Sequence, residues 1–319
     1  MKNDCKAVII TVNFRQNEFA VRFLTSASRL EGFPHCHLIV VDNDSDNSSV
    51  SRLRRASAEF LNVELLTSPE NGGYFGAASR ALRHYLESHS VPDWVVISND
   101  DVEFEDSQFL QRLFQKDPMS AAVIAPSIIS SLTTHDANPS IRRRPSRLRM
   151  WRYRLWLSNY YAMWFKQWLS PYVRRARFGL SNRTPAPAKS VSSQIYAPHG
   201  AFMIFSRKFF EAGGFIDDGS FLYAEEFCVA EMCRQLRLPV IHDPELRVRH
   251  AESQTLGRML SRRVYQHQKN GFRYILARYN NSYPELGAAF GTGPLSAKTT
   301  LPDAATDRHP FPATGEHVR

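Results

Sequence analysis

Short apolar runs alternate with longer amphipathic stretches over the first hundred residues of the chain. We predict strands at residues 7–12, 37–41, 63–66 and 94–97, and helices at residues 17–30, 48–60 and 75–87. Strands built almost entirely from apolar and β-branched residues are typical of parallel strands covered by helices on both faces. The pattern therefore predicts an open α/β sheet whose ligands bind beyond the carboxyl ends of its strands.

The stretch from residue 140 to residue 183 differs in composition from the rest of the chain. It holds twelve Lys and Arg residues and no acid, and Trp, Tyr and Phe residues interleave with these cations. We predict a basic aromatic helical insertion into the α/β core. Beyond residue 197 the alternation returns, with a strand at 202–205, a helix at 225–236 and a short strand at 240–242. The Gly-, Pro-, Ala- and Thr-rich residues 282–319 are predicted to form a flexible tail.

Length and composition restrict the class of protein. A chain of 319 residues with 43% hydrophobic residues can bury the core of one elaborated α/β domain or of two small domains. Its four cysteines lack paired spacing and indicate reduced thiols in a cytoplasmic protein. The chain shows no signal-peptide pattern and no apolar window long enough to span a bilayer, so any membrane contact is expected to be peripheral. A net charge of +9 is compatible with nucleic acid, anionic lipid or a phosphorylated substrate.

Polar clusters follow three of the predicted strands, namely Thr11-Val12-Asn13, Asp42-Asn43-Asp44-Ser45 and Asn99-Asp100-Asp101. Carboxylates there can accept bonds from a base or ribose or hold a divalent cation, although turns and helix caps use the same residue types. A glycine-rich loop, Asn71-Gly72-Gly73-Tyr74-Phe75-Gly76, opens the third helix and favours an anion. This loop lacks the GxGxxG pattern, which argues against a nicotinamide cofactor.

Two acids, Glu225 and Glu226, follow the aromatic stretch Phe221-Leu222-Tyr223-Ala224 at a predicted helix start. Desolvation and mutual repulsion would raise a carboxylate pKa there toward that of a useful base; the alternative is that both acids only stabilise the helix dipole. His250, further along the chain, is a candidate metal or phosphate contact, with a surface histidine as the alternative.

Taken in order, these clusters resemble the signatures of family 2 glycosyltransferases from about residue 7 to about residue 255. Residues 9–13 are similar to the first nucleotide contact, residues 40–45 to the aspartate that meets the base, residues 71–76 to the N-x-G loop and residues 98–102 to the metal-binding DxD. Residues 199–202 and 209–215 resemble the acceptor-side signature, and residues 221–226 stand where the family shows F-x-Y-x-E-D. Two departures are Asn99 in place of the first aspartate of DxD and Glu226 in place of the final aspartate.

The resemblance implies a GT-A (Rossmann-like) α/β fold, with a mixed, mostly parallel sheet flanked by helices. One domain is expected at residues 1–281, with a nucleotide-sugar-binding half at 1–110, the insertion at 140–183 and an acceptor and catalytic half at 194–255. Glu226 is implied as the catalytic base, with Glu225 and His199 orienting the acceptor and the base. Asp101 and His250 are implied ligands of Mg²⁺ or Mn²⁺. The implied contacts of the donor sugar nucleotide are Thr11, Asn13, Asp42, Asn43, Asn71, Gly73, Asn99 and Asp100.

The activity implied is inverting transfer of a sugar from a dTDP- or UDP-linked donor to a glycan or polyprenyl-diphosphate-linked acceptor in cell-surface polysaccharide synthesis. Arginines mixed with tryptophans in residues 140–183 suit peripheral contact with the inner face of the cell membrane. Single-stranded nucleic acid is the rival partner of such a segment, but the acidic mouth of the sheet argues against it. Packing as a helical hairpin or contact within a homodimer is the third alternative. The alternative function is a catalytically silent membrane- or nucleic-acid-binding module on the same scaffold.

Overall fold

The computed structural model describes residues 5–43, 47–133, 135–179, 191–251 and 260–279. The predicted tail at 282–319, together with Asp44 and Ser45, lies outside these residues. The described strands are β1 (Ala7–Asn13), β2 (Cys36–Asn43), β3 (Val63–Ser68), β4 (Trp94–Asn99), β5 (Val102–Phe104), β6 (Val123–Ser130), β7 (Ser193–Ile195), β8 (Phe202–Ser206) and β9 (Val240–His250). The described helices are α1 (Asn17–Ser28), α2 (Asn47–Ser57), α3 (Tyr74–Leu86), α4 (Phe109–Phe114), α5 (Arg147–Ser158), α6 (Tyr160–Gly179), α7 (Arg207–Glu211), α8 (Glu225–Gln235) and α9 (Arg262–Arg278), with a 3₁₀ turn at Phe33–His35.

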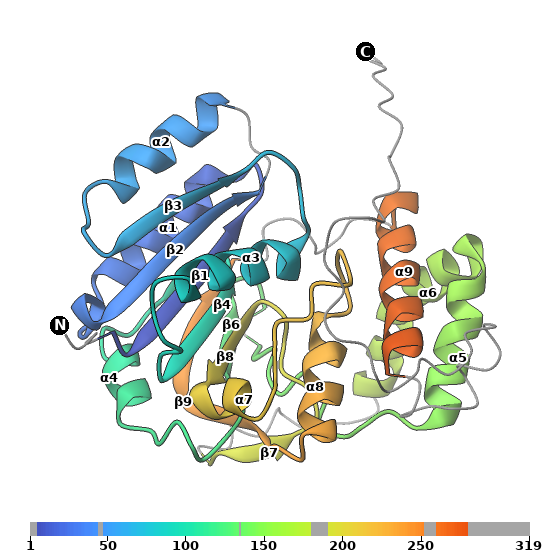
Figure 1. Cartoon of the computed structure of the whole chain (residues 1–319). Helices are drawn as coiled ribbons and strands as arrows, with labels where there is room; N and C mark the ends of the chain where they lie inside the picture. The colour runs from blue at the N-terminus through green and yellow to red at the C-terminus, as the bar shows by residue number, and fades with distance from the viewer. Residues whose placement is uncertain (1–4, 44–46, 134, 180–190, 252–259, 280–319) are drawn as a thin grey trace.

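The strands form a mixed sheet in the order β3-β2-β1-β4-β8-β6-β9-β5, with β7 paired to β9 (Figure 1). β3, β2, β1 and β4 are parallel to one another, whereas β8 runs antiparallel to both of its neighbours. β6 and β9 run parallel to each other, and β5 and β7 run opposite to β9. The prediction of a mixed, mostly parallel sheet is confirmed, and each of the four strands predicted before residue 100 is present.

Two buried layers hold the helices against opposite faces of the sheet. Alternate strand residues such as Ile9 and Val40 pack with Phe23 of α1 and Leu110 of α4 on one face. Their neighbours in sequence point to the other face, where they pack against α3, α7 and α8. Because successive side chains of a strand point to opposite faces, strands that are apolar throughout need a helix layer on each side.

The predicted basic insertion is helical and consists of α5 and α6. Together with α9 it forms a separate layer beside α8 (Figure 1), with a core that includes Met150, Met163 and Phe272. Arg144, just before α5, ties this layer to the main domain, because its guanidinium pairs with the fully buried carboxylate of Glu231 on α8 at 2.7 Å. Among the described helices, none combines the length and apolar character needed to cross a bilayer.

The prediction of a short strand at residues 240–242 is wrong, because β9 continues to His250. Proline lacks a backbone donor and normally interrupts a strand. Here the pairing of β9 with β6 shifts register between Pro126 and Ser127, so that Asp243 faces Pro126 and Arg247 faces Ser127. The irregularity accommodates Pro244, and the strand then carries His250 to the edge where β5 begins.

Candidate functional site

The carboxyl ends of β1, β2 and β4 bring three of the predicted clusters together. Parallel pairing places Asn13 opposite Asp42, and the neighbouring Val12 opposite Asn99. Asn13 and Asp42 are both buried, and the Asn13 Nδ2 donates to Asp42 Oδ1 at 3.0 Å. Thr11 is also buried, and within the described residues its hydroxyl has no hydrogen-bond partner. The strand ends therefore form a polar floor within an otherwise apolar sheet.

Asn43 connects this floor to the glycine-rich loop. Its side-chain oxygen accepts from the Gly72 N–H at 3.0 Å, and its Nδ2 donates to Asn71 Oδ1 at 2.9 Å. Asn71 Oδ1 also accepts from the Gly73 N–H at 2.9 Å. The two asparagines hold the loop in a fixed conformation at the start of α3, where the helix dipole is positive.

Gly73 joins the two halves of the domain at one point. Its φ of +77° lies in the left-handed region, and a Cβ built on it would lie 2.2 Å from the Phe221 carbonyl oxygen. The next residue, Tyr74, donates its N–H to the same oxygen at 3.3 Å. Only glycine permits both the conformation and the close approach, so this contact fixes the segment before Glu225 against the strand-end floor.

Asp100 and Asp101 form the turn between β4 and β5. Asp101 Oδ1 lies 3.0 Å from His250 Nε2, which arrives from the end of β9. The Asp100 Oδ2 atom is enclosed and has no partner in the part of the chain that the structure describes. Burial, followed by repulsion from Asp101, raises the pKa of this carboxyl well above its ordinary value. Among the described residues no group of three or more His, Cys, Asp or Glu side chains forms a ready metal cluster.

Glu225 and Glu226 begin α8 but lie in different environments. Glu225 is buried, and desolvation raises its pKa to about 7 against an ordinary value of 4.5. Its Oε1 atom forms no hydrogen bond with any described residue. Glu226 is half-buried, and its Oε1 accepts from the Gly200 N–H at 2.8 Å. The raised carboxylate pKa that was expected for this pair is found at Glu225.

His199 lies on the segment that precedes β8, next to these acids. Its backbone N–H donates to Asn138 Oδ1 at 2.9 Å, and its Nδ1 accepts from the Ala201 N–H at 3.2 Å. Its ring centroid lies 6.1 Å from that of His250. The structure therefore brings His199, His250 and Asp101 into one neighbourhood.

Tyr74, whose N–H meets the Phe221 carbonyl, was not among the predicted site residues. Its hydroxyl oxygen is enclosed without a partner among the described residues, and burial raises the pKa of the phenol well above its ordinary value. Repulsion from Glu225, Asp101 and Asp100 adds to this shift. The only sequence signal for Tyr74 is its place directly after the glycines of the loop.

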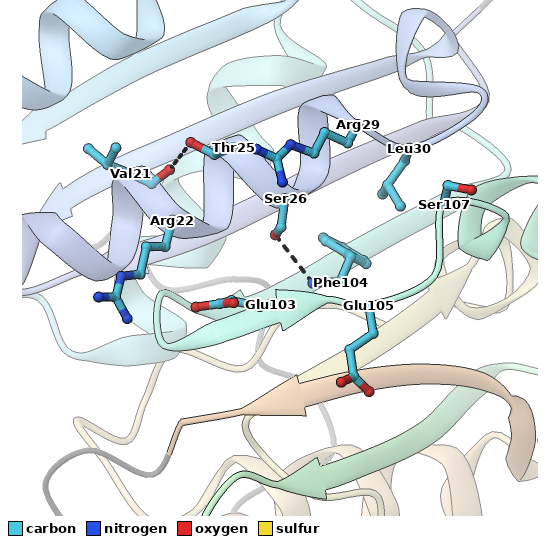
Figure 2. Close-up of a pocket in the computed structure, with 10 residues that line it drawn as sticks. All are labelled: Val21, Arg22, Thr25, Ser26, Arg29, Leu30, Glu103, Phe104, Glu105 and Ser107. Atoms are coloured by element: carbon cyan, nitrogen blue, oxygen red, sulfur yellow. Dashed lines mark hydrogen bonds between the residues drawn. The ribbon is translucent and has the colours of Figure 1, made fainter.

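A surface hollow elsewhere in the molecule contains none of the predicted residues. Figure 2 shows this space of about 510 Å³ between α1 and β5, with Arg22, Arg29, Glu103 and Glu105 among its lining residues. The Phe104 N–H donates to Ser26 Oγ at 3.2 Å and fastens the β5 edge to α1. We therefore place the candidate site at the strand ends.

An α/β sheet of this topology with acids at these points is the scaffold of a GT-A glycosyltransferase. GalNAc-T7, solved with UDP, GalNAc and Mn²⁺, matches 93% of this chain with a TM-score of 0.57 at 14% identity, and this chain spans 53% of that one. The family model for glycosyl transferase family 2 matches residues 7–213, and the chain belongs to this family of glycosyltransferases. The N-acetylglucosaminyl-diphospho-decaprenol L-rhamnosyltransferase of Mycobacterium tuberculosis (strains CDC 1551 / Oshkosh and ATCC 25618 / H37Rv) is 22% identical over 280 residues, which cover 85% of this chain and 84% of that protein.

Proposed function

We propose that the protein transfers a sugar, with inversion, from a UDP- or dTDP-linked donor to a hydroxyl of a polyprenyl-diphosphate-linked or other glycan acceptor. The observation that carries this proposal is the contact of Gly73 and Tyr74 with the Phe221 carbonyl, which brings the segment before Glu225 against the strand ends in a chain of glycosyltransferase family 2. Such a site offers one acidic pair to the acceptor and another to the donor sugar and to a cation beside the leaving diphosphate. It supports catalysis over a silent binding module.

In this proposal Glu226 is the base. It removes the proton of the acceptor hydroxyl while the new bond forms from that oxygen to the anomeric carbon and the bond to the diphosphate oxygen breaks. The hydrogen bond from the Gly200 N–H orients the Glu226 carboxylate, whose partial exposure leaves room for the acceptor. Glu225 and His199 are proposed to orient the acceptor and the base. The single displacement inverts the anomeric configuration.

The donor is proposed to occupy the strand-end floor and the glycine loop. Asp42 and Asn13 are proposed contacts of the nucleobase and the ribose, and the hydrogen bond between them orients both side chains. Thr11 offers a hydroxyl that has no partner among the described residues. Asn43, Asn71 and Gly73 support the diphosphate side by fixing the loop at the start of α3. Asn99 and Asp100 complete the contacts on the sugar side.

Asp101 and His250 are proposed to bind a divalent cation, Mg²⁺ or Mn²⁺, which when bound stabilises the charge of the leaving diphosphate. The side chains fit, because carboxylate oxygen and imidazole nitrogen suit these metals and Asp100 offers an unpaired oxygen nearby. Few protein ligands are needed, because such cations take further ligands from substrate phosphates and water. The Mn²⁺ in the GalNAc-T7 structure supports the same choice of cofactor.

A lipid-linked acceptor is supported by the mycobacterial relative, whose name describes a decaprenol-diphosphate acceptor. We place the enzyme at the inner face of the cell membrane, in contact with it through residues 140–183. Both helices of this insertion expose a stripe of large apolar side chains at helical spacing: Leu148, Trp151 and Leu155 on α5, and Tyr161, Phe165, Trp168 and Leu169 on α6. Exposed arginines such as Arg147 and Arg152 flank the α5 stripe, as an anionic surface requires.

The experiment is a thermal-shift screen of wild type and Asp101→Ala with UDP- and dTDP-sugars, each with and without Mg²⁺ or Mn²⁺. A ligand that binds only the folded protein raises Tm. We expect one donor to raise the Tm of the wild type in a metal-dependent manner, and the shift to be lost in Asp101→Ala. Absence of any shift for every donor and metal would favour the silent binding module.

A further inference from the structure

The Tyr74 hydroxyl is the least explained polar group of the candidate site. It is enclosed in protein, yet no described residue forms a hydrogen bond with it. Two other atoms share this condition in the same neighbourhood, Glu225 Oε1 and Asp100 Oδ2. Buried polar groups are normally paired, because each unpaired group costs free energy. Three such atoms from three separate segments indicate a place where a polar ligand supplies the missing bonds.

The remainder of Tyr74 is fully used by the fold. Its N–H donates to the Phe221 carbonyl, and its ring lies 5.5 Å from that of Phe75. These contacts fix Tyr74 against the segment that leads to Glu225, and the Asp100 and Asp101 carboxylates also act on its hydroxyl. Burial, with repulsion from the carboxylates added to it, keeps the phenol protonated, so the group acts as a hydrogen-bond donor.

We propose that the Tyr74 hydroxyl donates a hydrogen bond to the sugar nucleotide at the junction between its sugar and its diphosphate. This assignment rests on the proposed function, in which the base lies on one side of the bond that breaks and the diphosphate on the other. The junction must then lie between the proposed base and the proposed cation ligands, and Tyr74 is a tyrosine on which acids from both pairs act. An oxygen at this junction gains negative charge as the bond breaks. A hydroxyl that donates a hydrogen bond to this oxygen therefore stabilises the transition state more than the bound substrate.

The test is the Tyr74→Phe variant, which keeps the ring and the backbone bond and removes only the hydroxyl. We expect kcat/KM for the active UDP- or dTDP-sugar to fall about tenfold or more, as for a lost bond to a charged group. The Kd of the matching nucleoside monophosphate, which lacks the junction, should not change. Tm should stay equal or rise, because the hydroxyl has no partner in the free protein.

Tyr265→Phe is the matched control, because the buried Tyr265 hydroxyl donates to the Leu157 carbonyl at 2.8 Å, within the α5–α9 layer. Its loss should lower Tm and leave kcat/KM unchanged, the reverse of Tyr74→Phe. Equal turnover by Tyr74→Phe and the wild type would overturn the role of Tyr74 but not the proposed function. A fall in Tm of Tyr74→Phe like that of Tyr265→Phe would show a structural role instead. A wild type that turns over no sugar nucleotide would overturn both this inference and the proposed function.

Discussion

Glu225 and Glu226 are adjacent in sequence, but the start of α8 turns their side chains into different surroundings. Glu225 lies in the buried interior, whereas Glu226 meets the Gly200 N–H at a half-open position. The two acids are therefore suited to different tasks. Glu225 is a buried carboxyl with a pKa of about 7, whereas Glu226 is an accessible carboxylate that a hydrogen bond orients. This difference supports Glu226 as the proton acceptor and Glu225 as its neighbouring support.

The raised pKa of Glu225 predicts that stability depends on pH. The pKa of Glu225 is about 7 in the folded protein and 4.5 ordinarily. Between these two pH values the folded protein keeps the proton on Glu225, whereas the unfolded chain has released it. The free energy of unfolding should therefore fall as pH rises from about 4.5 to 7, by up to about 3 kcal/mol, and level off above. Urea unfolding of wild type and Glu225→Gln at pH 5 and pH 8 measures this. Equal pH dependence in both proteins would contradict the assignment.

Residue identity alone predicted part of the site. Asn13, Asp42 and Asn99 were expected together because parallel strands end at one edge, and their register confirms that they do. Tyr74 could not be found in this way, since it meets the Phe221 carbonyl, about 150 residues further along the chain. A tyrosine beside glycines has no distinctive pattern until the second half of the domain covers it.

At the scale of elements, α9 shows why the sequence pattern missed a helix. Gly271 lies in its interior, where glycine disfavours a helix by about 1 kcal/mol. A Cβ at this position would lie 2.8 Å from the Leu222 carbonyl oxygen, so glycine allows α9 to pack against the segment that leads to the acid pair. Phe221 also stacks on His267 of α9 with ring centroids 4.9 Å apart. Tertiary contact, which the local pattern does not contain, decides this element.

The α5–α6 hairpin leads to a prediction about membranes. Replacing Trp151, Phe165 and Trp168 with serine should weaken binding to vesicles of anionic lipid about tenfold or more, because half-exposed rings would no longer enter the interface. Donor-induced thermal shifts should not change. Leu61→Ser, at a fully exposed apolar residue on the opposite half of the domain, is the control and should bind like wild type. Equal binding by the triple variant would contradict membrane contact, and loss of a dimer in that variant would favour a homodimer interface instead.

At the scale of the whole molecule, the sheet joins a parallel half, β3 to β4, to a second half through the antiparallel β8. The first half could be predicted because its strands are short, apolar and regularly spaced. The second half could be predicted only in pieces, since β5, β6 and β9 pair over long sequence separations and β9 contains Pro244. The site lies where the halves meet, at Gly73 and Phe221, which is why its full composition required the three-dimensional structure.

The central claim is that Glu226 acts as the base of an inverting glycosyltransferase. The most direct measurement is transfer from the active UDP- or dTDP-sugar to a polyprenyl-diphosphate-linked acceptor by wild type and Glu226→Gln, with the anomeric configuration of the product determined by NMR. We predict an inverted product and a fall in kcat of about 10²- to 10⁴-fold in Glu226→Gln, with donor binding retained. A retained configuration, or a Glu226→Gln variant as active as the wild type, would contradict the account.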